Sequence, residues 1–542
     1  MNVAEAVGRG LYRHGVDHVF GVVGSGNFHV TNALISAGAR FVAAAHEGGA
    51  ASMADGYARV SGKLVALSLH QGPGFTNALT GITEAAKSRT PMIVLAPEAT
   101  NPRSNFFVDL PGIAKAIGAD FRRVDTDATG VAAMACERAV SGAGRTVVLG
   151  LPLDVQALPA GGAGTFASGI EARPDPDVNA LVEALVRSRR PLFIAGRGAA
   201  RHAADAREAL TALADKCGAL LAVSAAAKGL FAGSPWYLDI SGGFATPLAA
   251  ELISRADLVV AWGSTLNMWT TQNGRLIPQG ATVAQVDLEE SALGVNRKVD
   301  IGVRGDVAAV ARACSRAFPG SSAAGWRSAD LRARIAAEGA WRRVAYTDES
   351  APDRIDPRTL TIALDDLLPA ARTVVVDSGN FMGYPSMFLS VPDVHGFVFT
   401  QAFQSIGLGL ASALGAAVAR PDRLTVAALG DGGFAMSVAE LLTAVRLRLP
   451  LVVVVYDDAA YGAEVHHFGP DGLPLDTVKF PDTDLAAIAR GFGCAGAIVR
   501  TRGDLAAVRD WLRGPRDRPL VVDAKIVSTH GSWWLEEAFR GH

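Results

Sequence analysis

The sequence has no excess of charge of one sign. It carries 51 Lys and Arg against 53 Asp and Glu, and no block of basic residues stands out. Proteins that bind nucleic acids need clustered Lys and Arg to neutralise the phosphates. We therefore expect no nucleic-acid partner.

Long apolar runs are also missing. No segment reaches the roughly 18 uninterrupted apolar residues of a membrane-spanning helix, and the N-terminus shows helical patterning in place of a secretion signal. We expect a cytoplasmic protein with no membrane partner. Cysteine is scarce, and the spacing of Cys136, Cys217, Cys314 and Cys494 matches no metal site. A reducing compartment is the simple interpretation.

The length and the pattern of apolar segments predict several domains. A chain of 542 residues exceeds what one hydrophobic core supports. Short apolar strands alternate with Ala-rich helical stretches, which is typical of α/β domains with doubly wound parallel sheets. We predict three such domains at residues 1–160, 175–325 and 350–542, with linkers at 158–176 and 321–356. The expected strands are 18–22, 40–44, 64–69, 92–96 and 146–151 in the first domain, 192–195, 220–223, 258–262 and 282–287 in the second, and 373–377, 424–429, 451–456, 497–499 and 520–525 in the third.

Carboxylates follow two neighbouring strands of the third domain. Gly430-Asp431-Gly432 ends one strand, and Asp457-Asp458 ends the next. Because parallel strands end side by side, Asp431 and Asp458 could share a hard cation such as Mg²⁺. Gly432 and Gly433 would let backbone N–H groups approach a diphosphate at the helix start. The alternative is an ordinary turn, where Gly and Asp occur for steric reasons alone.

This segment resembles the thiamin-diphosphate signature, in which Gly-Asp-Gly is followed within thirty residues by Asn-Asn. Asp457-Asp458 stands where the two asparagines are expected. The replacement adds negative charge beside a diphosphate and leaves the metal preference open. With its three α/β domains, the chain resembles the thiamin-diphosphate-dependent 2-oxo acid enzymes, in the group of acetolactate synthase large subunits and benzoylformate and pyruvate decarboxylases.

The resemblance implies how the cofactor is bound. The first domain would bind the aminopyrimidine, and the third would bind the diphosphate and the metal. The active site would lie between the subunits of a homodimer or of a dimer of dimers, a homotetramer. The metal ligands would be Asp431, Asp458 and Ala460, and Ile406 would support the bent cofactor unless it is an ordinary core residue. The other implied cofactor contacts are Gly430, Gly432, Gly433 and Tyr461.

Glu47, in His46-Glu47-Gly48-Gly49-Ala50, occupies the place of the glutamate that contacts the pyrimidine ring in this family. A carboxyl group hydrogen-bonded to a ring nitrogen stabilises the imino tautomer, whose nitrogen then removes the thiazolium proton. The alternative is an acidic residue that interacts with the dipole at a helix start.

Three further residues are candidates for proton transfer or substrate contact. His70 ends a strand, resembles a histidine of benzoylformate decarboxylase, and is well placed to donate or accept a proton; it could also be structural. Ser25 resembles a serine of that enzyme that contacts the substrate carboxylate, or it caps a helix. Glu464 resembles a glutamate beside the reacting carbon in pyruvate and indolepyruvate decarboxylases, or it is a solvated charge.

Two departures from the family bear on specificity. Many acetolactate synthases carry Phe-Gln-Glu where this chain has Phe106 and Phe107. A more apolar pocket would follow, and straightforward acetolactate synthesis is less expected. In the middle domain, Gly196-Arg197-Gly198 lacks the third glycine of a dinucleotide fingerprint. Some relatives bind FAD in this domain, but we do not predict FAD here.

The resulting hypothesis is an enzyme that uses thiamin diphosphate and Mg²⁺ on a small 2-oxo acid substrate. It would decarboxylate the 2-oxo acid to an enamine, and then protonate that enamine or add it to a second carbonyl. His70 and Glu464 favour the decarboxylase, a lyase, while the overall likeness favours the carboligase, a transferase. The alternatives are an FAD-containing oxidoreductase of the pyruvate oxidase type and a non-catalytic paralogue, which would lack Glu47 or Asp431.

Overall fold

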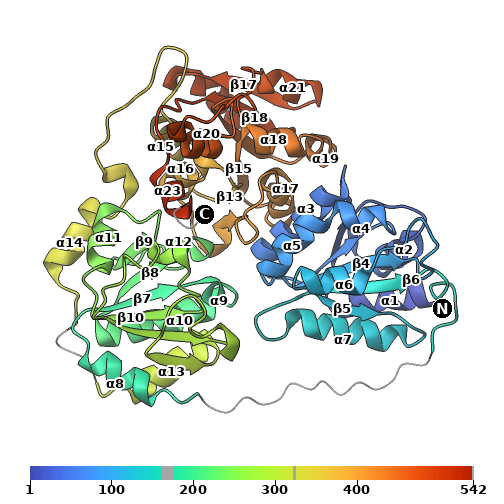
Figure 1. Cartoon of the computed structure of the whole chain (residues 1–542), viewed down its shortest axis with the longest axis horizontal. Coiled ribbons are helices and arrows are strands. Elements are labelled where there is room, and N and C mark those ends of the chain that lie inside the picture. The colour runs from blue at the N-terminus through green and yellow to red at the C-terminus, as the bar shows by residue number, and fades with distance from the viewer. Residues whose placement is uncertain (162–175, 321–324, 540–542) are drawn as a thin grey trace.

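A computed structural model contains three α/β units, which we call the N-terminal, central and C-terminal domains. The structure describes residues 1–161, 176–320 and 325–539. Each domain is built on one parallel six-stranded sheet with flanking helices (Figure 1). The predicted fold class, three doubly wound parallel-sheet domains, is confirmed.

The N-terminal domain has the strand order β2-β1-β3-β4-β6-β5. Its strands are β1 (His18–Gly21), β2 (Arg40–Ala43), β3 (Val65–Ser68), β4 (Met92–Glu98), β5 (Asp120–Arg123) and β6 (Thr146–Pro152). Its helices are α1 (Val3–Arg13), α2 (Phe28–Ala37), α3 (Glu47–Ser61), α4 (Pro73–Asn77), α5 (Leu79–Lys87), α6 (Leu110–Ala116) and α7 (Ala128–Val140).

The central domain has the order β12-β11-β10-β7-β8-β9, the arrangement of dinucleotide-binding sheets. Its strands are β7 (Pro191–Ala195), β8 (Leu220–Val223), β9 (Tyr237–Ile240), β10 (Leu258–Trp262), β11 (Thr282–Asp287) and β12 (Ile301–Arg304). Its helices are α8 (Asn179–Arg187), α9 (Arg197–Ala200), α10 (Ala203–Cys217), α11 (Pro247–Ile253), α12 (Met268–Thr271), α13 (Val307–Ala317) and α14 (Ala329–Glu338).

The C-terminal domain has the order β14-β13-β15-β16-β18-β17, the same pattern as the N-terminal domain. Its strands are β13 (Arg372–Val376), β14 (Phe397–Phe399), β15 (Leu424–Gly430), β16 (Leu451–Asp457), β17 (Ala495–Val499) and β18 (Leu520–Lys525). Its helices are α15 (Pro357–Leu367), α16 (Gly383–Phe388), α17 (Gly409–Ala419), α18 (Asp431–Ser437), α19 (Glu440–Arg446), α20 (Gly462–Phe468), α21 (Leu485–Gly491), α22 (Ala506–Arg513) and α23 (Trp533–Phe539).

The inner strands are apolar because helices cover both faces of each sheet. In β16 every residue from Leu451 to Asp457 is buried. Side-chain caps begin several of the helices; in α1, Asn2 and Glu5 form a reciprocal capping box. No helix of the described residues is long and apolar enough to cross a membrane.

The structure differs from the sequence prediction in its edge strands and in one predicted linker. The four strands β5, β9, β12 and β14 were not predicted, and all four lie at sheet edges. The predicted linker at 321–356 contains α14, whose Arg334 pairs with Glu251 of α11 and whose Ile335 is buried. This helix packs on the central domain (Figure 1). The predicted linker at 158–176 lies largely outside the described residues.

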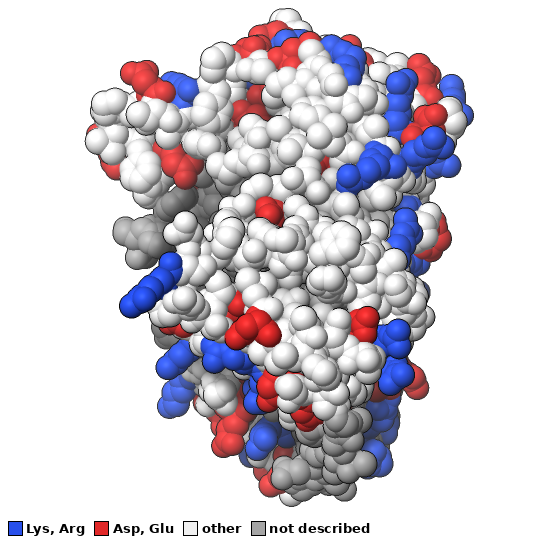
Figure 2. All heavy atoms as spheres, turned by 90° about the vertical axis from the view of Figure 1, so that its right-hand side faces the viewer, with Lys and Arg blue, Asp and Glu red and all other residues white. Residues whose placement is uncertain are grey.

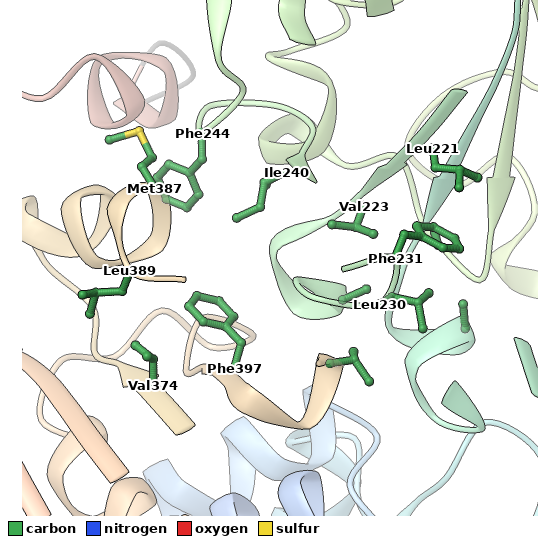
Figure 3. Close-up of a cluster of buried hydrophobic side chains, with 14 of the residues drawn as sticks. Leu221, Val223, Leu230, Phe231, Ile240, Phe244, Val374, Met387, Leu389 and Phe397 are labelled. Atoms are coloured by element: carbon green, nitrogen blue, oxygen red, sulfur yellow. The ribbon is translucent and has the colours of Figure 1, made fainter. Parts of the chain in front are cut away.

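The C-terminal domain packs against both other domains. A buried cluster joins it to the central domain, where Phe244 and Ile240 face Met387 and Phe397 (Figure 3). Toward the N-terminal domain, α17 crosses α3 at close range. A Cβ on Gly415 would lie 1.9 Å from the Met53 carbonyl oxygen. This junction matters for the site because α3 begins at Glu47.

Candidate active site

The carboxylates of the Gly-Asp-Gly segment and of the aspartate pair meet at the end of the C-terminal sheet. Asp431 begins α18 directly after β15, and Asp458 follows β16. The two strands pair in parallel up to Gly430 and Tyr456. The backbone N–H of Ala460 donates to Asp431 Oδ2 at 3.1 Å. The structure therefore brings together the three residues expected to hold a metal.

The electrostatics of this pair fit a cation. Burial raises the pKa of Asp431 to about 8, and the carboxylates of Asp458 and Asp457 add to the increase. Burial and the Asp457 carboxylate raise the pKa of Asp458 to about 7. In the described residues no group of three or more His, Cys, Asp or Glu side chains forms a metal site. A cation bound here would need further oxygens from backbone carbonyls or from a ligand, as is usual for Mg²⁺.

Asp457 has its own counterion. Lys525, at the end of β18, donates to Asp457 Oδ2 at 2.5 Å and is only 1% exposed. The same ammonium pairs with Asp482 at 2.8 Å. Burial lowers the pKa of Lys525, but the Asp457 and Asp482 carboxylates outweigh it and raise the pKa above its usual value. The additional charge that replaces the first asparagine is thus balanced within the protein.

Gly432 and Gly433 leave no room for side chains in the first turn of α18. A Cβ on Gly432 would lie 2.5 Å from Cε1 of Tyr461, and a Cβ on Gly433 would lie 2.5 Å from Oδ2 of Asp377. The start of α18 is therefore surrounded by Gly430, Gly432, Gly433 and Tyr461. Packing explains the glycines, and the same lack of side chains lets a ligand approach the backbone.

Ile406 lies on a loop beside α18 and is partly exposed. Gly407, the next residue, has φ +86° and packs on Met436 of α18. Asp377 accepts hydrogen bonds from the N–H groups of Gly407 at 2.8 Å and Leu408 at 3.2 Å. Burial raises the pKa of Asp377 to about 6. Ile406 is therefore not fully buried in a core, and its loop is held beside α18.

Glu47 is the first residue of α3, and its side chain is partly exposed. The Asn77 amide donates to Glu47 Oε2 at 3.1 Å. A Cβ on Gly74 would lie 3.5 Å from Glu47 Oε1 and 3.1 Å from Cβ of His70. Glu47 and His70 therefore approach each other across the turn that follows β3.

His70 has a buried Nδ1 with no hydrogen-bond partner among the described residues. Its ring meets Phe106 edge-on, with 5.9 Å between the ring centroids. A Cβ on Gly24 would lie 2.4 Å from His70 Nδ1, and the next residue, Ser25, is exposed. Ser25, His70 and Phe106 thus gather with Glu47 at one end of the N-terminal sheet. Buried polar atoms are usually hydrogen-bonded, so this ring nitrogen remains available to a ligand or a water molecule.

Glu464 lies in the first turn of α20 and is partly exposed. Two residues later, His466 Nε2 lies 3.3 Å from Ser528 Oγ, which donates to Asp458 Oδ2 at 3.3 Å. Burial, with a smaller effect of His530, lowers the pKa of His466. Ser528 was not predicted, and no motif around it could have indicated it. Ser528 links His466 of α20 to Asp458.

The glycine segment of the central domain has a packing role. A Cβ on Gly196 would lie 2.5 Å from the Gly263 carbonyl oxygen, and a Cβ on Gly198 would lie 2.7 Å from Gly263 Cα. The turn after β7 therefore packs directly on the turn after β10. This close contact explains why glycine stands at both positions without a bound nucleotide.

Three family models match the chain in succession. The N-terminal TPP binding domain of the thiamine pyrophosphate enzymes matches residues 1–112, the central domain matches residues 178–314, and the C-terminal TPP binding domain matches residues 377–524. Thiamine pyrophosphate is another name for thiamin diphosphate. The chain belongs to the thiamine pyrophosphate enzyme family, as the sequence resemblance predicted.

Relatives of the chain differ in their activities. Sulfoacetaldehyde acetyltransferase of Alcaligenes xylosoxydans xylosoxydans is 30% identical over 92% of this chain and 88% of the relative. A Pseudomonas aeruginosa protein described as a probable 2-ketoarginine decarboxylase is also 30% identical, over 95% and 91%. The acetolactate synthase isozyme 2 large subunit of Escherichia coli K12 is 26% identical over 99% and 97%.

A solved structure has the same fold. The thiamine diphosphate-dependent 4-hydroxybenzoylformate decarboxylase of Rhodococcus jostii RHA1 superposes with a TM-score of 0.80. The match covers 98% of this chain and 100% of that chain at 21% identity. At this identity the likeness establishes the architecture alone. Transferases, synthases and decarboxylases among the relatives therefore define a shared cofactor class rather than one reaction.

Proposed function

We propose that this chain is a thiamin-diphosphate- and Mg²⁺-dependent enzyme that cleaves a 2-oxo acid beside its carbonyl group and acts as a decarboxylase or carboligase. The observation that carries this proposal is the meeting of Asp431 and Asp458 at the end of the C-terminal sheet, in a chain of this family. When bound, thiamin diphosphate supplies the electron sink for breaking the bond to CO₂.

The C-terminal domain would hold the charged end of the cofactor. Asp431, Asp458 and the backbone of Ala460 would bind Mg²⁺, and Gly432 and Gly433 would leave the diphosphate close to the backbone. The raised pKa values of Asp431 and Asp458 support this role, because the two carboxylates lie close together and no cation balances them in the part of the chain that the structure describes. Ile406 would support the cofactor from its loop beside α18.

The N-terminal domain would move protons. Glu47 would hold the pyrimidine ring nitrogen and favour removal of the thiazolium proton. His70 would donate or accept a proton at the reacting carbon through its unpaired Nδ1. Ser25, beside it, would contact the substrate carboxylate. Glu464, from α20, would protonate the product or orient the departing carboxylate.

Substrate choice would follow from an apolar wall. Phe106 and Phe107 are about two-fifths exposed, and the Phe106 ring meets the His70 ring edge-on. They favour a 2-oxo acid with an apolar side chain over one with a charged side chain. The product assay below distinguishes the two possible second steps, protonation of the enamine and addition to another carbonyl.

We further propose that two chains complete each active site, as a homodimer or a dimer of dimers. The hydrogen-bond partner that the structure shows for Glu47 is Asn77 of its own domain. Figure 2 shows the molecule from the right-hand side of Figure 1, where α19 and the N-terminal domain lie, and charged side chains there gather mainly at the margins. Met436 of α18 is 60% exposed and Leu442 of α19 is 53% exposed. A second copy would cover such apolar side chains.

The test is a product assay on the purified chain. Thiamin diphosphate, Mg²⁺ and a panel of 2-oxo acids are supplied, and CO₂, aldehyde and acyloin are measured. We expect CO₂ release that requires both cofactors, with aldehyde marking a decarboxylase and acyloin marking a carboligase. Absence of CO₂ from every 2-oxo acid would contradict the proposal. Light scattering of the same sample tests the dimer, and a monomer with full activity would exclude the shared site.

A further inference from the structure

Two buried glutamates at the junction of the N-terminal and C-terminal domains have no role in the chemistry described above. Glu84 lies on α5 of the N-terminal domain, and Glu440 is the first residue of α19 of the C-terminal domain. Each is 2% exposed. Burying a carboxylate is costly unless it is fully hydrogen-bonded, so their partners indicate what they do.

Glu440 crosses to the N-terminal domain. Its Oε1 accepts the backbone N–H of His46 at 3.0 Å, and its Oε2 accepts that of Ala45 at 3.2 Å. These two residues directly precede Glu47. Thr443 donates its hydroxyl to the same Oε2 at 2.8 Å. A Cβ on Gly49 would lie 2.0 Å from Glu440 Oε1, so the first turn of α3 closes around this carboxylate.

Glu84 crosses in the opposite direction. Its Oε2 accepts the backbone N–H of Phe403 at 2.6 Å, and its Oε1 accepts that of Ala402 at 3.2 Å. These residues begin the loop that carries Ile406. Arg59 of α3 donates to Glu84 Oε1 at 2.6 Å and to the Phe399 carbonyl oxygen at 2.9 Å.

The charge of Glu84 is stabilised at this place. Burial raises the pKa of Glu84, but the Arg59 guanidinium and the N–H groups of Phe403 and Ala402 outweigh it, so the pKa lies below its usual value. Hydrogen bonds to a charged acceptor are stronger than neutral ones. Glu84 therefore holds the start of the Ile406 loop as an ion, while Asp377 holds the end of the same loop.

We propose that Glu84 and Glu440 are positioning residues that form a reciprocal clamp: each carboxylate, from one thiamin-diphosphate-binding domain, fixes the loop of the other domain that carries Ile406 or Glu47. The inference rests on the proposed function for the roles of those two residues. The clamp links both loops to the α3–α17 junction, so neither loop moves independently of the domain packing. A shift of about 1 Å at a reacting group can slow a reaction by a hundredfold, which gives the clamp a chemical purpose.

The first test measures the loops in the cofactor-free protein by hydrogen–deuterium exchange and mass spectrometry. Glu440→Gln keeps the size of the side chain but loses the charge and one acceptor. We expect about tenfold faster exchange in the segment 43–47 and little change in 400–406, because a charge-assisted bond to the backbone is lost. Glu84→Gln should give the opposite pattern, with faster exchange in 400–406.

Glu289→Gln is the matched control. Glu289 of the central domain also forms a contact between domains, with Arg89 of the N-terminal domain at 3.0 Å, but it holds neither loop. Its variant should leave exchange in both segments at the wild-type rate. Unchanged exchange in Glu440→Gln and Glu84→Gln, or equal loosening in Glu289→Gln, would overturn the clamp.

The second test distinguishes positioning from a merely structural role. Deuterium exchange at the thiazolium C2 of bound thiamin diphosphate, followed by NMR after acid quench, reports how well Glu47 and the cofactor are aligned. At saturating cofactor we expect C2 exchange to slow about tenfold or more in both clamp variants and not in Glu289→Gln. Loosened loops with wild-type C2 exchange would overturn the positioning role. Failure of the wild-type protein to bind thiamin diphosphate would instead contradict the proposed function.

Milder variants keep the test decisive if the glutamine variants do not fold. Thr443→Val removes the hydroxyl that donates to Glu440, and Ser88→Ala removes the hydroxyl that donates to Glu84 Oε1 at 3.2 Å. Both retain the carboxylate. We expect the same two segments to exchange about two- to threefold faster, each in its own variant. Wild-type exchange in both would overturn the proposal.

Discussion

The N-terminal and C-terminal domains have sheets with the same strand order, but their candidate sites differ in burial. In the C-terminal domain, Asp431 is buried and Asp458 lies close to it, and burial raises the pKa of both carboxyl groups. In the N-terminal domain, Glu47 is partly exposed and Ser25 is exposed, and their contacts within the domain are few. The same architecture therefore supports two kinds of site.

The difference has a physical reason. A site that holds a cation and a diphosphate gains from buried charge, because low dielectric strengthens each interaction once the ligand is present. A site that moves protons needs groups that remain free to contact cofactor and substrate. We therefore expect substitutions in the C-terminal site to change binding and stability together, whereas substitutions in the N-terminal site should change turnover alone.

The largest effect is expected from Glu47→Gln in the N-terminal site. Turnover should fall by about 10² to 10⁴, the usual contribution of a positioned acid–base group. The melting temperature should stay at the wild-type value because the side chain is partly exposed and glutamine can still accept from Asn77. Product formation and thermal unfolding are measured on the same sample. Full activity of the variant would contradict the catalytic assignment, and Glu289→Gln serves as the control.

Asp431→Asn in the C-terminal site should change two measured quantities in opposite directions. Cofactor affinity in the presence of Mg²⁺ should fall about ten- to hundredfold, because a charged ligand of the metal is lost. The cofactor-free protein should melt at a higher temperature at pH 8, because one of two neighbouring buried carboxylates is neutralised. Calorimetric titration and thermal unfolding measure the two effects. The exposed Asp422→Asn is the control, and a lower melting temperature for Asp431→Asn would break the comparison.

Inner and edge strands differ in how completely the sequence predicted them. Inner strands such as β16 were predicted because both faces are buried, which makes them continuous apolar runs. The edge strands β5, β9, β12 and β14 were missed. β5 and β12 expose polar residues, and β14 has only three residues. Their pairing depends on a neighbouring strand that is distant in sequence, and no local pattern records that neighbour.

Site residues divide in the same way. Motifs located Asp431 and Glu47 because spacing along the chain encodes their chemistry. The partners that decide what these residues can do come from other elements, and local sequence did not reveal them. Lys525 lies 68 positions from Asp457, and Glu440 lies 394 positions from His46. Asp457-Asp458 adds negative charge relative to the Asn-Asn of the signature, and Lys525 balances the charge of Asp457.

A smaller effect is expected from His70→Ala in the N-terminal site. If the unpaired Nδ1 takes part in proton transfer, kcat should fall about tenfold or more, and affinity for thiamin diphosphate should stay unchanged. Steady-state kinetics and calorimetric titration separate the two. Reduced cofactor affinity at unchanged kcat would place His70 in cofactor binding and remove it from the proton-moving group. Glu289→Gln, which lies outside the candidate site, serves as the control.

The smallest effect is expected from Asp377, which belongs to the C-terminal site but accepts only backbone N–H groups near Ile406. Burial raises its pKa to about 6, above the usual value of 3.8. The folded protein thus keeps this proton at a pH where the unfolded chain has lost it. The stabilisation from the protonated form is fully present below about pH 4 and is lost as the pH rises through about 6. Asp377→Asn cannot ionise, so its melting temperature relative to wild type should rise by a few degrees between pH 4 and 6 and stay constant above. If the difference in melting temperature between Asp377→Asn and wild type does not change between pH 4 and 6, the pKa of Asp377 is not raised by burial as the pKa values of Asp431 and Asp458 are.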